Sequence, residues 1–319
     1  MRVLIVTWGM TALLSAQTAF SWLSDPVHPR GIALANASVA GPGMTEALDL
    51  NPAGLRWGGR ERSSTRSFLV GLSHYAAGLN QQLTQLVLPV ARQVVALELR
   101  RFDYGTFAGY DENAEQLGDY TAADLLIRGG LARPFGRYLS LGMSVGALSS
   151  RLEEVTAKAL LWSLGAQLDV VPLRACLGVA VLNQGRFISS FGEDMDDGLP
   201  AAWLVGLEKS LAYLPLTIHL STGRTRGTDQ LVWRMGGEFQ LPRGLKLRFG
   251  VDQGKMYYIR GNTYADLLSG FSLGLGIETG GLGDAGTTDR PVSHLFLDGA
   301  VKYQGPLGVS SALALGLKF

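Results

Sequence analysis

Hydrophobic and polar residues alternate along most of this chain from about residue 63 onward. In the final stretch, "GVSSALALGLKF", every second position from Val309 to Phe319 is apolar or a serine, and the positions between them carry Ser, Ala, Gly and Lys. A period of two residues is typical of a β-strand with one apolar face, because successive side chains point to opposite sides of a sheet. The C-terminal stretch is therefore predicted to be a strand.

The same alternation recurs in about 14 segments. They are 64–73, 79–89, 93–102, 120–132, 139–149, 156–170, 174–182, 201–211, 215–222, 231–241, 245–253, 270–278, 294–303 and 308–319. Many are close to ten residues long, the length that a tilted strand needs to cross a bilayer. An even number of strands suits a bacterial membrane barrel in a single chain.

A soluble β-sandwich would show the same alternation with its apolar face turned inward. Two features favour a barrel in lipid instead. The polar faces are rich in Gly, Ser and isolated charges, as a crowded polar lumen would be, and the chain closes an alternating strand with an aromatic, Phe319. We therefore expect an all-β fold, a transmembrane antiparallel β-barrel of about 14 strands over residues 63–319.

The connections between the predicted strands differ in length. "LPVARQ", "RPFGRY", "DVVPLR", "SLAYLP" and "LPRG" are short and punctuated by Pro or Gly, as turns are. Residues 103–119, 183–200 and 254–269 are predicted to be long polar loops on the opposite, outer side. Residues 279–293 break this rule, since they form a long connection on the side of the short turns.

The first 21 residues, "MRVLIVTWGMTALLSAQTAFS", have the layout of a secretory signal peptide. Arg2 precedes an apolar run too short to span a bilayer, and small residues at Ala19 and Ser21 offer cleavage sites. The alternative, a buried N-terminal helix, lacks a cap and a polar face. The mature chain is predicted to be exported.

Residues 22–62 precede the first strand and are rich in small, weakly charged residues. The stretch "ASVAGPGMTEALDLNPAGL" ends in Asn51-Pro52-Ala53, where a residue before proline is held extended and the Asn amide can bond the backbone in a turn. We expect this segment to form a plug inside the barrel, its polar groups satisfied by luminal side chains. The alternative is a disordered periplasmic tail.

Composition and charge exclude several classes of function. The formal net charge of +1 offers no basic surface for nucleic acid, and charged residues make up only 17% of the chain, which has 42 glycines. The single cysteine, Cys176, is expected to be a buried small hydrophobe. Four histidines are spread along the chain without metal-ligand spacing: His28, His74, His219 and His294. No metal, cofactor or enzymatic activity is predicted.

Other candidate motifs have simpler explanations. The glycine-rich stretch 272–286 lacks the Gly-Lys-Ser/Thr ending of a phosphate loop and is expected to be strand and turn. Acidic residues that could hold Ca²⁺ are expected to be solvated in outer loops, and they are Asp111, Glu112, Glu115, Glu193, Asp194, Asp196 and Asp197.

Charged residues on the polar faces of the strands should project into the lumen. They are Glu98, Arg100, Asp124, Arg128, Asp169, Arg234, Glu238, Lys246, Arg248 and Asp252. Unpaired charges in a narrow lumen are costly, so these groups are expected to pair across strands or with the plug. A substrate path lined by the same charges is the alternative.

The opening "RGIALANASVAGPGMTEALDLNPAGL" resembles the start of FadL-like outer-membrane proteins, and is most similar to the PorV/PorQ family of type IX secretion barrels. "SVGALSSRLEE", "GVAVLNQG" and "LPAAWLVGLEKSLAYLPLTI" resemble its PorQ branch. Arg30-Gly31-Ile32 and Gly41-Pro42-Gly43 depart from the family's usual residues. The terminal Phe319 looks like the signal that the barrel-assembly machinery binds in Gram-negative outer membranes.

This resemblance implies an accessory or cargo-handling role in type IX secretion, with other secretion components or secreted cargo as partners. A FadL-like transporter of hydrophobic small molecules is the alternative, and a purely structural outer-membrane protein is a third possibility. All three place the chain in the outer membrane, in contact with lipid.

Overall fold

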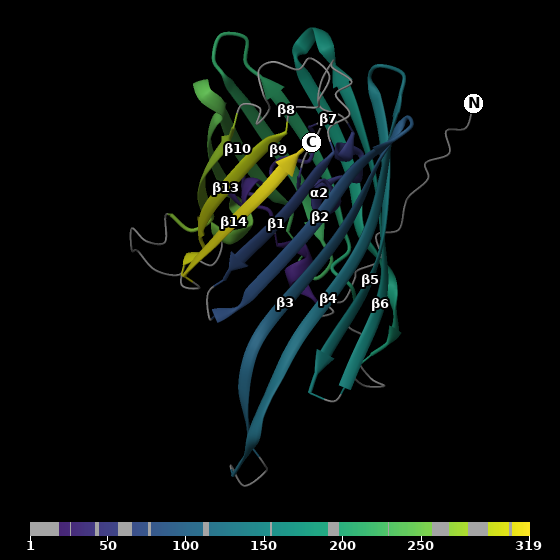
Figure 1. The fold of residues 1–319 in the computed structure, drawn as a ribbon, viewed down its shortest axis with the longest axis vertical. Helices are drawn as coiled ribbons and strands as arrows, with labels where there is room; N and C mark the ends of the chain where they lie inside the picture. Colours follow the sequence, from purple (N-terminus) through teal and green to yellow (C-terminus); the bar gives the residue numbers. More distant parts are fainter. Residues whose placement is uncertain are drawn as a thin grey trace, which may run out of the picture.

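The alternating segments form one closed antiparallel barrel. The computed structural model describes residues 19–25, 27–41, 45–56, 66–75, 78–110, 115–153, 155–190, 198–228, 230–256, 268–279, 293–305 and 308–319. Each strand pairs with its neighbours in sequence, and β1 closes the ring on β14 (Figure 1). The strands are β1 Ser67–His74, β2 Asn80–Val90, β3 Gln93–Tyr110, β4 Gln116–Phe135, β5 Leu139–Leu152, β6 Val155–Val170, β7 Ala175–Ser189, β8 Ala202–Ser210, β9 Leu216–Thr225, β10 Val232–Gln240, β11 Leu245–Asp252, β12 Phe271–Glu278, β13 His294–Tyr303 and β14 Val309–Lys318.

The predicted all-β fold class and its 14 strands are therefore confirmed. The seam that closes the barrel includes the last residue of the chain. Arg66 and Phe319 exchange backbone hydrogen bonds of 3.1 and 2.9 Å, which extends the β1–β14 pairing by one step. Phe319 thus lies at the rim, next to the first strand.

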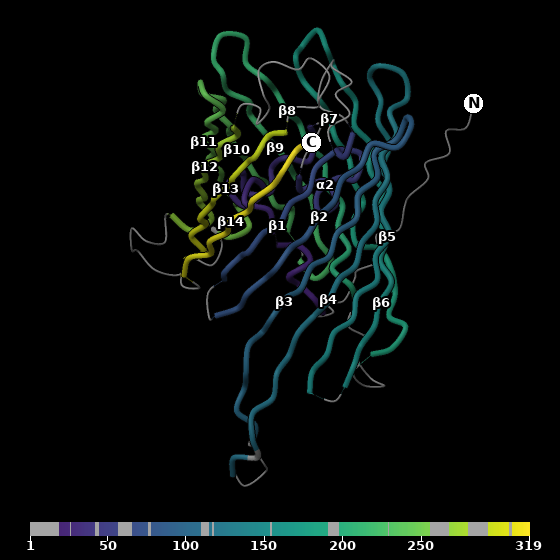
Figure 2. The backbone as a smooth tube through the Cα atoms, viewed as in Figure 1, coloured from purple at the N-terminus to yellow at the C-terminus, as the bar shows by residue number. Residues whose placement is uncertain are grey.

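The prediction of a long loop over residues 103–119 was wrong for most of that range. β3 and β4 continue to Tyr110 and from Gln116, and they form a two-stranded hairpin that reaches well beyond the rest of the barrel (Figure 2). Phe107 stacks on Tyr120 at 5.4 Å across this hairpin, and Gly105, with φ of 87°, absorbs a register shift. Cross-strand aromatic pairs stabilise such an extension, which alternation alone did not distinguish from a polar loop.

The long connection predicted at 183–200 is also shorter than expected, because β7 continues to Ser189. Within the predicted loop 254–269, the helix α3 covers Gln253–Met256. The connection at 279–293, which did not fit the pattern of short turns, lies almost wholly outside the described residues, as do residues 1–18 of the predicted signal peptide.

The two faces of the barrel differ sharply. Large apolar side chains such as Leu72, Val145, Leu164, Leu273 and Leu313 are half-exposed or more on the outside, and exposed apolar side chains occur on strands all around the ring. The alternate positions are buried inside. No helix among the described residues has the length and apolar character to cross a membrane.

The lumen is occupied by the N-terminal part of the chain. It comprises η1 Ser21–Ser24, α1 Pro29–Ala33, α2 Ala47–Leu50 and η2 Pro52–Leu55, and α2 is visible within the ring of strands (Figure 1). We call residues 27–56 the luminal segment. Every described residue of this segment is buried except Arg30, Thr45 and Asp49, which are partly buried.

Candidate functional site in the barrel lumen

Glycines on the inner wall let the luminal segment lie directly against the strands. Gly236 on β10 and Gly250 on β11 are cross-strand partners that face the backbone of Leu34 and Ala35. A Cβ added at Gly250 would lie 2.6 Å from Ala35 N, closer than real Cβ atoms come. Further inward glycines lie against backbone or side-chain atoms of the segment, and they are Gly130, Gly142, Gly165, Gly178, Gly206 and Gly274.

The Asn51-Pro52-Ala53 motif joins the luminal segment to itself and to the wall. Asn51 Nδ2 donates to Val39 O at 2.9 Å and to Ala166 O on β6 at 3.2 Å, while its Oδ1 accepts from Ala53 N at 3.1 Å. Asn51 is extended and caps η2, and Pro52 occupies the first position of that helix. Ser140 Oγ on β5 donates to Ala53 O at 3.1 Å. The motif is a buried anchor.

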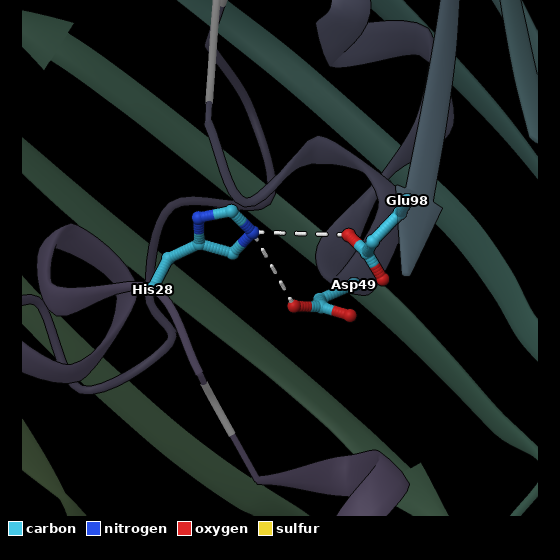
Figure 3. A group of neighbouring side chains, drawn as sticks. All are labelled: His28, Asp49 and Glu98. Carbon is cyan, nitrogen blue, oxygen red and sulfur yellow. Dashed lines mark ion pairs between the residues drawn. The ribbon is translucent and has the colours of Figure 1, made fainter. Parts of the chain in front are cut away.

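A buried ionic cluster holds the segment against β3 and β4. Asp49 accepts from Arg100 Nη1 at 2.6 Å and from Arg128, and Glu98 accepts from Arg128 Nη2 at 2.6 Å. His28 Nε2 lies 3.8 Å from Glu98 Oε2 and 4.0 Å from Asp49 Oδ2 (Figure 3). Arg128 Nη1 also donates to Leu48 O at 2.7 Å. The two carboxylates and two guanidinium groups balance in formal charge.

His28, Asp49 and Glu98 each offer a possible metal-ligand atom, and these atoms lie within 4.8 Å of one another. Their surroundings do not suit a divalent cation. Arg100 and Arg128 already neutralise both carboxylates, so a bound cation would leave excess positive charge in a buried site. The cluster is better explained as an ion-pair network between the luminal segment and the wall. The sequence predicted that Glu98, Arg100 and Arg128 form pairs, but it did not identify Asp49 or His28 as their neighbours.

A second buried network lies on the opposite wall. Arg30 Nε donates to Glu238 Oε2 at 3.0 Å, and Arg248 Nε donates to the same oxygen at 2.6 Å. Arg30 also pairs with Glu46, whose carboxylate accepts from Ser38 Oγ at 2.6 Å. Burial alone would raise the pKa of Glu46, but Arg30 and the Ser38 hydroxyl hold that pKa below its ordinary value. This pair therefore stays charged at neutral pH.

Apart from Asp124, the remaining charges predicted to face the lumen also lie in pairs inside the barrel. Arg56 of the luminal segment forms a bidentate contact of 2.5 Å with Asp169. Lys302 Nζ lies 3.0 Å from Asp252 Oδ2. The pairs that complete the set are Arg234 with Asp252 at 3.6 Å, Lys246 with Glu278 at 2.9 Å, and Arg248 with Asp298.

One part of the lumen is apolar and aromatic. Beside the start of the β3–β4 extension, Phe102 is surrounded by Tyr75, Tyr104 and Trp22, with ring centroids 5.8, 4.8 and 5.4 Å away. We call this group the aromatic cluster; its other buried members are Leu23, Leu126, Leu148, Ala159, Leu161 and Leu199, and Phe20, Leu79 and Phe187 pack against it.

Asp124 is separate from the ionic networks and lies at the aromatic cluster. Its side chain is buried, and its carboxylate accepts from Trp22 Nε1 at 2.6 Å, from Tyr104 Oη at 2.9 Å and from Ser150 Oγ. The expectation was that Asp124 pairs with another charge or lines a path. Here hydrogen-bond donors satisfy it instead.

Of the acidic residues predicted to lie in outer loops, one is exposed and the others lie outside the described residues. Glu115 is exposed at the tip of the β3–β4 hairpin. Asp111, Glu112 and the acidic stretch 193–197 are not among the described residues. Sequence reasoning missed Trp22, because it directly follows the predicted signal peptide and no alternation marks it.

No protein-family model matches this chain, and no curated protein matches it. Solved structures do resemble it. The Pseudomonas putida toluene transporter TodX is 14% identical with a TM-score of 0.53, over 91% of this chain and 96% of that one. A Pseudomonas aeruginosa FadL homologue is 12% identical with a TM-score of 0.50, over 92% and 98%. At such identities the likeness concerns the fold, which matches FadL-like barrels.

Proposed function

We propose that this chain is an outer-membrane barrel that takes up small hydrophobic molecules, with the luminal segment sealing the pore. The observation that carries the proposal is the aromatic cluster, which gathers more aromatic side chains than any other buried apolar cluster among the described residues. Binding sites for small hydrophobic molecules are concave or enclosed, lined by apolar and aromatic side chains, and carry few polar groups.

The outer surface supports insertion in a bilayer. Exposed Leu, Val, Ile, Phe and Trp side chains cover the strands on all sides, far beyond the apolar patches of soluble monomers. A closed ring satisfies every strand edge, as the hydrocarbon region requires. An outer-membrane location also agrees with the predicted export signal.

The luminal segment supports the sealing role. Its glycine-lined contacts and its two ionic networks tie it to opposite walls. A barrel of 14 strands without such a filling would pass water and ions. Uptake of a hydrophobic molecule together with a closed pore is the combination that this arrangement supports.

The type IX role remains a prediction from sequence resemblance, and the solved structures favour the transporter. One strain separates the two. Deleting residues 27–56 should raise single-channel conductance and alter uptake of a labelled hydrophobe, with surface display of type IX cargo unchanged. Normal uptake together with cargo trapped in the periplasm would overturn the transporter proposal and support secretion.

A further inference from the structure

We infer that Trp22 occupies the ligand site as an internal substitute, and that the molecule which replaces it is a small planar aromatic with one hydrogen-bond donor. The inference rests on the proposed function and specifies its substrate class. Trp22 belongs to a short N-terminal helix, yet only 4% of its surface is exposed. Its surroundings define what could take its place.

The ring of Trp22 packs against two flat groups. It stacks on Phe102, with the ring centroids 5.4 Å apart and only 18° between the planes. The guanidinium carbon of Arg100 lies over the ring, 5.2 Å from its centroid, in a cation–π contact. Leu126, Leu148 and other apolar side chains complete the cluster. Removing a large buried side chain leaves a cavity, and apolar cavities of this kind bind small aromatic molecules.

The indole N–H of Trp22 donates to a buried carboxylate. Nε1 donates to Asp124 Oδ2 at 2.6 Å, and Tyr104 donates to the same oxygen. A hydrocarbon in place of the indole would leave this buried carboxylate with one donor fewer, which is unfavourable. A molecule with an N–H or O–H at that edge would restore the bond.

Anionic ligands are disfavoured by the same carboxylate. Arg100 lies over the ring, but its guanidinium is already bound to Asp49 at 2.6 Å. A fatty acid or benzoate anion would meet Asp124 without a free positive partner. Indoles, phenols and anilines are thus preferred over both hydrocarbons and carboxylates.

The position of Trp22 in the chain would allow its side chain to be displaced by a ligand. With signal cleavage predicted after Ala19 or Ser21, Trp22 would lie within the first three residues of the mature protein. The chain connects it to the luminal segment through residues 23–26. Displacing the N-terminal helix would leave the ionic networks of the luminal segment in place.

The test is binding to the purified full-length barrel in detergent, measured by calorimetry. Trp22→Ala should bind indole, and indene, which has the same shape without the N–H, should bind roughly tenfold more weakly or worse. In Trp22→Ala combined with Asp124→Asn this difference should shrink to a fewfold. Trp233→Ala, which removes an exposed Trp on the outer face of β10, is the matched control and should gain no indole binding.

Absence of indole binding in Trp22→Ala would overturn the site, and equal binding of indole and indene would overturn the role of Asp124. If Trp22→Ala does not assemble, Trp22→Leu keeps an apolar side chain while freeing the acceptor, and it is assayed in the same way with the same two outcomes. Because binding is measured without transport, intact indole binding with no uptake by cells would contradict the proposed function alone.

Discussion

Replacing Gly250 by alanine tests whether the luminal segment is seated on the glycine-lined wall. The added Cβ would lie 2.6 Å from Ala35 N, 2.6 Å from Leu34 C and 2.7 Å from Ala33 O, about 0.8 Å short of ordinary contact. All three are backbone atoms, so no side-chain rotation relieves the clash. The segment must shift or the strands must separate.

Overpacking of this kind costs typically about 1–3 kcal/mol. If the cost falls on the seating of the luminal segment, the population with that segment displaced rises roughly 5- to 150-fold. Gly129→Ala is the matched control, because Gly129 lies on β4 with no atom within 4 Å of an added Cβ. Both changes remove the same backbone freedom from the unfolded chain, so their difference isolates the clash.

The assay is single-channel conductance in planar bilayers, with proteolysis of residues 37–55 as a second measure. Gly250→Ala should show frequent open events and faster cleavage, whereas Gly129→Ala should match the parent protein. Identical conductance and cleavage for the two variants would show that the luminal segment does not lie against this wall.

The other predictions concern the ionic cluster, the lipid face and the C-terminus. Asp49→Ala leaves two buried guanidinium groups with one carboxylate and should lower the free energy of unfolding by about 3–5 kcal/mol. Asp103→Ala, which removes one partner of an exposed ion pair, is the control and should lower it by about 0–1 kcal/mol. Equal losses of the two variants in urea titrations would refute the network. Leu247→Arg on the outer face of β11 should cost about 2–4 kcal/mol at the bilayer midplane, and a neutral effect would contradict the lipid-facing assignment. Deleting Phe319 should reduce the heat-modifiable barrel in outer-membrane fractions, and unchanged yield would count against an assembly signal.

The strands could be predicted because their signal is local. In β11, Leu245, Leu247 and Val251 alternate with Lys246 and other inward residues, so the period of two residues appears in any short window. The same local signal cannot tell where pairing stops. The β3–β4 extension looked like a loop because Gly105 and Gly109 interrupt the pattern, although a bulge lets the pairing continue.

The contents of the lumen could be predicted only in outline. Asn51 is distinctive as part of an Asn-Pro sequence, but its bond to Ala166 joins residues 115 positions apart. His28, Asp49 and Glu98 meet only because the chain folds back inside a closed ring. Trp22 becomes a candidate only once Phe102 and Asp124 surround it. Contacts of this kind depend on tertiary structure, which periodicity does not contain.

The most direct test of the proposed uptake is the initial rate at which intact Gram-negative cells take up a labelled small aromatic such as indole. Cells that display this barrel in the outer membrane should accumulate the label several-fold faster than cells with an empty vector, with no rise in the entry of small hydrophilic solutes. Equal rates of uptake, at a confirmed amount of folded barrel in the outer membrane, would contradict the account.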